Sequence, residues 1–357
     1  MKVRVSEKLV WLGVILTLTL VMAAGVGAQP GEFVKGVLQP LADGFPRRAI
    51  VLIVVDEAGS RDGIYGRTMQ QALKGISPVP IAVSDEPAAA MGTYLKLKET
   101  PDRDGGKEGH YPIIVNCWGA SSDTLGEPIT KELGLDVSDM NMVIITEFFP
   151  YTMVQRKNAP WGRKFKDLVA WAKANPGKLR RTTDAVGSGQ DIAGTAMMKH
   201  FGIKDVKLPQ PSIQDGLAAV GAGQSDIQIS SFGNVMSHVL AGKMDISLVF
   251  GSSVPPPFDK DPGVSTTEAE GITFLSPVGV QMGFAVPKQV PQAHIDWLFK
   301  LFKAGASTDV YKQREKTIPG FRLNIVNGKD ANAMKMEFYN FCDPIIRELE
   351  LHVDQQK

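Results

Sequence analysis

A junction at residues 178–201 constrains this chain more than any other segment, because an extended run, a glycine turn and a helix follow one another there. Residues 179–183 can form a strand, Gly187, Ser188 and Gly189 lie in a turn too rich in glycine for regular structure, and residues 191–200 have helical spacing. The first N–H groups of a helix have no partner within it and lie at the positive end of its dipole. The junction therefore predicts an anion site, with a plain connecting turn as the alternative.

Two further apolar runs end in similar turns. Residues 49–55 are an almost unbroken β-branched run, typical of a strand covered on both faces, and a glycine turn and a helical pattern follow. Residues 111–116 have the pattern of another buried strand, followed by a small, polar turn at 117–122. Strands that alternate with helices predict an α/β fold with largely parallel sheets. Because ligands collect at the carboxyl ends of strands in such sheets, all three turns are candidates to line one crevice.

The N-terminus has the features of a secretory signal. Lys2, Arg4 and Lys8 flank an apolar stretch that runs to about residue 25, and small residues precede Gln29. We therefore expect residues 1–28 to be removed near Ala28 and the protein to be periplasmic. An uncleaved membrane anchor is the alternative, since the stretch approaches the length of a short spanning helix.

Charge and cysteine content exclude some classes of protein. Without residues 1–28, which hold three basic residues and one acidic one, the formal charge is −1 instead of +1, so no nucleic acid partner is expected. A chain of this length ordinarily forms about two domains. Cys117 and Cys342 form either one disulfide or two buried thiols.

Catalytic patterns are missing from the sequence. The five histidines, at positions 110, 200, 238, 294 and 352, have no metal-ligand spacing, and Ser188 does not lie in a Gly-x-Ser-x-Gly elbow. We therefore predict no catalytic residues, no metal site and no cofactor. A secreted hydrolase remains an alternative, because active sites need not show a local motif.

Four stretches, taken in order, carry a resemblance to a known family. They are residues 53–67 with 83–92, residues 165–178 (FKDLVAWAKANPGK), residues 186–190 (VGSGQ), and residues 216–227 (GLAAVGAGQSDI) leading through 241–244 to 265–271. In these stretches the chain resembles the extracytoplasmic solute receptors of tripartite tricarboxylate transporters, which are periplasmic substrate-binding proteins. The likeness extends over nearly all of the chain after residue 28.

The resemblance implies a type II-like α/β fold, with two mixed sheets joined by two crossover strands, and a monomer without catalytic activity. Residues 29–142 and 275–357 would form the first lobe, and residues 143–274 the second. A small organic carboxylate would bind in the cleft, as in a Venus flytrap, and would be delivered to the membrane permease subunits. Presentation of the ligand to a sensor kinase is the alternative output, and the identity of the carboxylate stays open.

Candidate ligand-binding residues lie in four turns; the resemblance implies those of the first and third turns, and the other two turns are candidates because each follows a predicted strand. They are Ala58, Gly59, Ser60 and Arg61; Trp118, Gly119 and Ala120; Val186, Gly187, Ser188, Gly189 and Gln190; and Ser231 and Phe232. Several have a second interpretation. Arg61 is either a ligand clamp or part of an ion pair. Trp118 either stacks on a flat ligand or packs in the core. Ser231 either contacts the ligand or only begins a helix.

The first turn departs from the family pattern. Members usually have an uncharged turn that ends in an aspartate four residues before an arginine, whereas here Asp56, Glu57 and Arg61 intrude, and Gly63 lies four residues before Arg67. Two acidic side chains beside an anion site would repel a carboxylate unless they point away or are paired, so the roles of Asp56 and Glu57 stay open.

Overall fold

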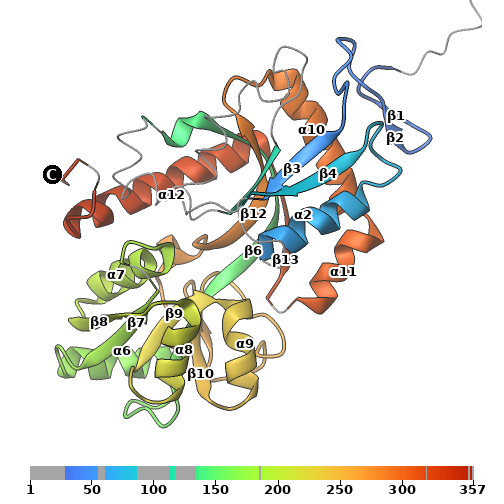
Figure 1. The fold of residues 1–357 in the computed structure, drawn as a ribbon. Helices are drawn as coiled ribbons and strands as arrows, with labels where there is room; N and C mark the ends of the chain where they lie inside the picture. Colours follow the sequence, from blue (N-terminus) through green and yellow to red (C-terminus); the bar gives the residue numbers. More distant parts are fainter. Residues whose placement is uncertain are drawn as a thin grey trace, which may run out of the picture.

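The computed structural model describes residues 29–54, 61–86, 113–117, 134, 136–184, 186–318, 320–352 and 354–355. Figure 1 shows two lobes, one above the other, each with a β-sheet at its centre and helices on the outside. The predicted two-lobed α/β fold is therefore confirmed. The predicted signal segment at residues 1–28 lies outside the described residues.

The first lobe, at the top of Figure 1, contains a mixed sheet. Its strands lie in the order β4 (Ile81–Asp85), β3 (Ile50–Val54), β5 (Ile113–Cys117), β12 (Gly279–Pro287), β6 (Met140–Arg156) and β13 (Arg322–Asn327). Strand β3 is parallel to β4 and β5, and β12 is antiparallel to both β5 and β6. The strand predicted at residues 49–55 is β3, and the one predicted at 111–116 is β5.

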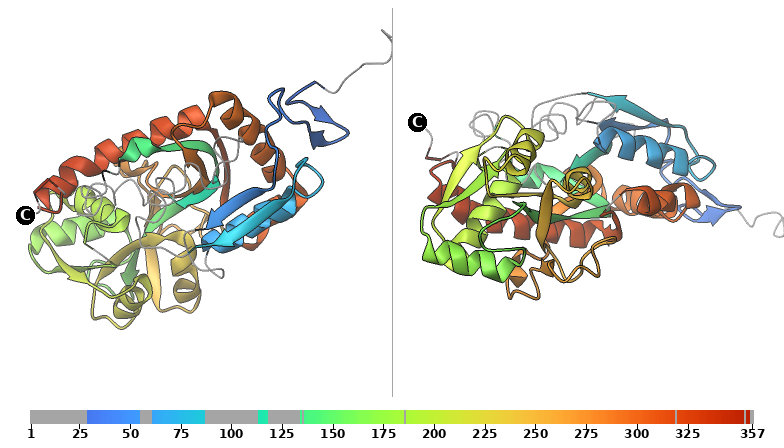
Figure 2. Two further views of the ribbon diagram at one scale, coloured as in Figure 1. Left: turned by 45° about the horizontal axis from the view of Figure 1, so that its top comes forward. Right: turned by 90° about the horizontal axis from the view of Figure 1, so that it is seen from below.

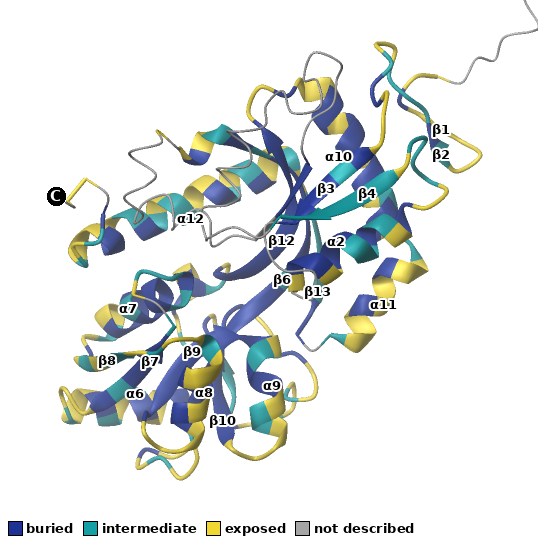
Figure 3. Ribbon diagram, in the orientation of Figure 1, coloured by how far each residue is buried: buried dark blue, intermediate teal, exposed yellow. Residues whose placement is uncertain are grey.

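Helices cover both faces of the first sheet, because its strands are apolar on both sides. The face with Leu52 and Val54 packs against α2 (Arg61–Ala72) and α10 (Gln292–Ala306). The opposite face, with Ile53 and Ile114, packs against α12 (Gly328–Glu348). Figure 2 shows α2 and α12 on opposite sides, and Figure 3 shows the buried strands between helices that expose one side. A short helix, α11 (Asp309–Thr317), lies beside α2.

The second lobe repeats this plan. Its strands lie in the order β8 (Asp205–Pro209), β7 (Leu179–Thr183), β9 (Ile227–Ser231), β6, β10 (Met244–Val249) and β11 (Ser265–Thr266). Its helices are α6 (Phe165–Ala174), α7 (Gly189–Phe201), α8 (Ile213–Gly221) and α9 (Phe232–Leu240). Shorter elements elsewhere in the chain are β1 (Phe33–Val34), β2 (Val37–Leu38), η2 (Val137–Asp139) and η3 (Thr273–Leu275).

Strand β6 joins the lobes, because its first part pairs with β12 and β13 and its last part with β9 and β10. Pro150 lies between these parts, opposite Gly279, and proline has no N–H for the ladder. The regular pairing is therefore weakest where one lobe passes into the other. The chain returns through residues 267–278, and since β6 belongs to both lobes, the lobe boundaries at 142 and 274 stay predictions.

The two cysteines are only partly described. Cys342 is completely buried in α12. The side chain of Cys117, at the end of β5, lies outside what the structure describes. One disulfide and two buried thiols therefore both stay predictions.

Candidate ligand site at the lobe junction

The carboxyl ends of the parallel strands in both lobes point at the lobe junction. In the first lobe β5 ends at Cys117, which pairs with Met282 of β12. Met282 is three residues after Gly279, where β12 begins opposite Pro150. In the second lobe β9 ends at Ser231 opposite Tyr151, and β7 runs parallel to β9. Strand ends of this kind are where α/β proteins bind ligands. This junction is thus the candidate site.

Two of the predicted turns follow first-lobe strands that end at this junction. Ala58, Gly59 and Ser60 come after β3, and Trp118, Gly119 and Ala120 come after β5. All six residues lie outside the described part of the chain, so their roles stay predictions.

The predicted strand, turn and helix at residues 178–201 are present as β7, a turn and α7. Ser188 is the N-cap of α7, and its Oγ accepts a hydrogen bond from the Asp191 N–H at 3.3 Å. The same hydroxyl donates to Asp184 Oδ1 at 2.8 Å. The Ser188 side chain is therefore used to build the turn, and any contact with a ligand is left to main-chain groups.

A buried ion pair supports this turn from below. The Gly187 N–H donates to Asp191 Oδ2 at 3.1 Å, and Arg181 Nη1 lies 3.0 Å from Asp191 Oδ1. Asp191 and Arg181 are 0% and 1% exposed, and Lys207 also reaches Asp191. Gly187 has a φ of +83°, a backbone conformation that residues other than glycine rarely adopt. Asp191 therefore fixes the turn, and because it accepts the hydrogen bond of the Gly187 N–H, that N–H is not available to a ligand.

Two amides at the start of α7 remain available. Within the described part of the chain, the N–H groups of Gly189 and Gln190 have no hydrogen-bond partner. Gly189 is nevertheless a buried residue, and the Tyr151 hydroxyl lies 3.0 Å from where a Cβ on Gly189 would stand. A buried donor without a partner is costly, so this helix terminus is suited to accept an anion. Val186 is exposed at the edge of the turn.

The start of α9 lies at the same edge of the second sheet. Ser231 is its N-cap but makes no side-chain capping hydrogen bond. Phe232 is completely buried, and its ring closely faces Gly320 of the first lobe. Its position thus favours a packing role for the ring, while ligand contact by Ser231 and Phe232 stays a prediction.

Arg61 begins α2, and its Nε lies 3.5 Å from Asp62 Oδ1. An ion pair was one of the two interpretations of Arg61. The other, a role as ligand clamp, stays a prediction. Arg67 binds the Gly63 carbonyl and both carboxylate oxygens of Asp85 at the end of β4. The family pattern has an aspartate four residues before this arginine, and here Gly63 takes that position. Asp85, from β4, is thus the acidic partner of Arg67.

Sequence reasoning missed a buried polar network on β6. Arg314 in α11 binds Glu147 through Nε at 2.6 Å and Nη2 at 2.9 Å, and the Tyr311 hydroxyl donates to the same carboxylate at 2.7 Å. Tyr311 and Tyr65 both contact the hydroxyl of Thr146. Burial raises the pKa of Glu147, although Arg314 opposes this shift, and raises the pKa of both tyrosines well above 10. No short motif marks this network, because its residues are far apart in the sequence.

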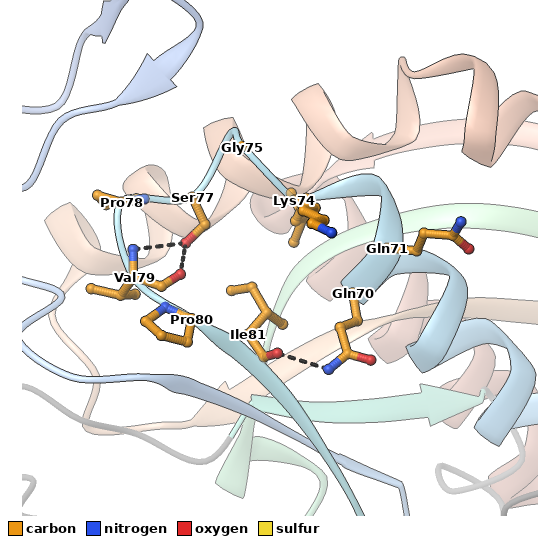
Figure 4. A pocket seen from close by; sticks show the side chains of 10 residues that line it. Gln70, Gln71, Lys74, Gly75, Ser77, Pro78, Val79, Pro80 and Ile81 are labelled. Atoms are coloured by element: carbon orange, nitrogen blue, oxygen red, sulfur yellow. Dashed lines mark hydrogen bonds between the residues drawn. The ribbon is translucent and has the colours of Figure 1, made fainter.

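A groove of about 590 Å³ beside the far end of α2 is not part of the site. It lies where β4 begins, at the edge of the sheet away from the junction. Figure 4 shows that Gln70 Nε2 donates to the Ile81 carbonyl and that Ser77 contacts Val79, so these two side chains are already paired.

The described residues contain neither a cluster of metal ligands nor a helix suited to span a membrane. No group of three or more His, Cys, Asp or Glu residues there could hold a metal ion. None of the helices in that part of the chain has the length and apolar character needed to span a membrane.

Comparison with known proteins gives a consistent result. The model of the tripartite tricarboxylate transporter family receptor matches residues 117–351. A UPF0065 protein of Cupriavidus necator is 24% identical over 303 residues, covering 82% of each chain, and one of Bordetella pertussis is 23% identical over 255 residues, covering 71% of this chain and 74% of that protein.

Solved structures share the fold. A TctC solute-binding protein from Polaromonas, without ligand, has a TM-score of 0.71 at 20% identity and covers 85% of this chain and 99% of its own. MatC of Rhodopseudomonas palustris, with bound malate, has a TM-score of 0.62 at 16% identity over 85% of this chain and all of its own. A second R. palustris protein, with adipate, has a TM-score of 0.64 at 17% identity over 85% of this chain and 97% of its own.

Proposed function

The chain belongs to the tripartite tricarboxylate transporter receptor family, and from this premise we propose that it captures a small organic carboxylate between its lobes for delivery to a permease. One observation carries the choice of ligand class. Gly189 is buried at the N-terminus of α7 and its N–H has no described partner, and a Cβ on it would stand 3.0 Å from the hydroxyl of Tyr151, which lies opposite Ser231 at the junction. The bound malate and adipate in two structures of the same fold agree with this choice.

In the proposed complex the ligand carboxylate accepts hydrogen bonds from the Gly189 and Gln190 amides. The positive end of the α7 dipole adds about 0.3–1 kcal/mol in such a position, and more where the site is partly buried. The other end of the ligand would meet the first-lobe turns after β3 and β5. Closure of the lobes would exclude water and strengthen each of these contacts.

The proposed receptor works without catalysis, in the periplasm, after removal of residues 1–28. The membrane components of a tripartite transporter are its proposed partners, and a monomer is its proposed state. Incubation with a bound acid should return that acid unchanged; its turnover would contradict the receptor function.

A pair of substitutions at one position tests the amide contact. Gly189→Pro removes a single N–H at the first position of a helix, where proline is tolerated, and Ser188 already has the extended conformation that a following proline requires (φ −63°, ψ 160°). Gly189→Ala adds a comparable Cβ and keeps the N–H.

Binding of succinate, malate, adipate, citrate and benzoate should be measured by calorimetry for both variants and the original protein. We expect the tightest of these acids to bind Gly189→Pro about tenfold to a hundredfold more weakly than Gly189→Ala, the range for a hydrogen bond to a charged group. Gly221→Ala, at the end of α8 with only ordinary contacts around its Cβ, is the remote control. Equal affinity of the proline and alanine variants would show that this amide does not bind the acid.

A further inference from the structure

A second hollow lies between α12, β12, β13 and the returning chain at residues 274–278. It has two adjoining parts of about 280 and 290 Å³, which share Pro277, Gln281 and Met334. We call it the hinge pocket, because β12 and the returning chain connect the two lobes.

The part of about 280 Å³ forms an aromatic end of the hinge pocket. Phe274, Phe338 and Phe341 line that end, with ring centroids of Phe341 at 6.3 Å from those of both Phe274 and Phe338. Glu337 is the charged residue among the lining side chains of this end. A flat apolar group fits there, and Glu337 disfavours a second negative charge beside it.

The other end is polar and cationic. Arg322 lines it, together with Ser276 and Asn324. Arg322 Nη2 donates to the Ser253 carbonyl at 2.7 Å, but no carboxylate among the described residues forms an ion pair with this guanidinium. Burial lowers the pKa of Arg322, so an added carboxylate would replace lost solvation.

Gln281 lies where the two ends meet. Its residue is 4% exposed, and its Oε1 has no hydrogen-bond partner. A buried acceptor without a donor is costly, and native structures rarely leave one unexplained. A rotation of the Gln281 side chain that turns Oε1 into the pocket would let a hydroxyl or N–H between the ring and the acid group of a ligand satisfy it.

The hinge pocket adjoins the α7 end of the candidate site, but no described residue of the α7 turn lines it. It lies on the α12 face of the first sheet, whereas α2, which follows the first ligand turn, covers the opposite face. Phe338 forms a common wall, since its ring lies 3.9 Å from where a Cβ on Gly189 would stand. Ligands at the two places would share this wall and otherwise depend on different residues.

We propose that the hinge pocket binds a second small molecule, an aryl carboxylate with a hydroxyl or amide N–H between ring and acid. The ring lies among Phe274, Phe338 and Phe341, the donor meets Gln281 Oε1, and the carboxylate meets Arg322. Because the pocket is built partly from the returning chain, its occupant would contact a segment that connects the two lobes.

The test uses 3-phenyllactate as the probe and 3-phenylpropanoate as the same molecule without the hydroxyl, with calorimetry on the full protein. We expect Arg322→Met to weaken 3-phenyllactate about tenfold to a hundredfold, and Arg322→Lys to restore part of the loss. Gln281→Met should lower the affinity for 3-phenyllactate to the level of 3-phenylpropanoate. The same substitution should leave the affinity for 3-phenylpropanoate unchanged. Gly189→Pro should change neither.

A second pair of variants keeps the test decisive if Arg322→Met unfolds. Met334→Trp should fill the meeting point of the two ends and abolish probe binding. Met336→Trp, on the exposed side of α12, is the matched control and should bind like the original protein. The proposal is overturned if 3-phenyllactate fails to bind, binds both tryptophan variants equally, or is lost in Gly189→Pro instead.

Discussion

Two arginines with buried acidic partners lie on either side of the lobe junction. In the second lobe Arg181 holds Asp191 beneath the α7 turn, and in the first lobe Arg314 holds Glu147 of β6. Removing one partner from such a pair leaves a buried charge without compensation, which is the main cost of the change. These residues therefore support the site from behind without being available to a ligand themselves.

Replacing Glu147 with glutamine should destabilise the protein by about 3 kcal/mol or more, because Arg314 would stay buried without its counter-charge. Urea unfolding at neutral pH measures this loss. The matched control is Glu348→Gln, which removes the same charge from an exposed pair with Lys199 and should change the midpoint little. Equal effects of the two substitutions would contradict the assigned role of the Glu147 network.

At the scale of elements, α12 is attached to the start of β6 by a buried lysine. Lys335 is 4% exposed, and its Nζ donates to the carbonyls of Val137, at 2.8 Å, and Met140. Burial lowers the pKa of Lys335 to about 8, although Asp136 and Asp139 oppose the shift. The helix is thus held at the edge of the sheet by a group that titrates near neutral pH.

The free energy of unfolding should therefore rise between about pH 8 and pH 10. In this window the unfolded chain keeps the proton on Lys335 while the folded protein loses it, so stability increases with pH, by on the order of 2 kcal/mol. Above pH 10 the raised pKa values of Tyr65 and Tyr311 act in the opposite direction.

Urea unfolding at pH 7.5, 8.5 and 9.5 measures this slope. It should disappear in Lys335→Met and persist in Lys329→Met, which changes an exposed lysine of the same helix. A slope that survives Lys335→Met would assign it to other groups.

Elements that contain an apolar run could be predicted from the sequence, whereas a mostly polar one could not. Strands β3 and β5 were predicted because residues 49–55 and 111–116 are apolar runs. Helix α11 was not predicted, since Tyr311 and Arg314 are its buried residues and all its other residues except Val310 are polar. Helix α12 begins at Gly328, and Asn327 caps it by accepting a hydrogen bond from the Asp330 N–H.

Part of the candidate site could be predicted for a similar reason. The glycine turn before α7 could be predicted because its residues are adjacent in the sequence. Which of Arg180 and Arg181 is buried depends on the direction of each side chain in β7, and adjacent residues alternate. The hinge pocket brings together Phe274, Arg322 and Phe341, which no local pattern joins.

For the whole molecule, the shared strand β6 predicts a single unfolding transition. Variants that keep only Trp297, in the first lobe, or only Trp161, in the second, report on the lobes separately. Their fluorescence midpoints in urea should coincide, because loss of either sheet removes partners from the same strand. Midpoints that differ clearly would mean that the lobes unfold independently despite this strand.

The position of β12 also sets an order of assembly. This strand lies in the middle of the first sheet, between β5 and β6, yet it is synthesised after the whole second lobe. A growing chain can therefore complete the later lobe before the earlier one, whose sheet stays divided until residues 279–287 have emerged. Contacts between such distant parts of a sequence form slowly, so the first half of the chain waits longest for its partners.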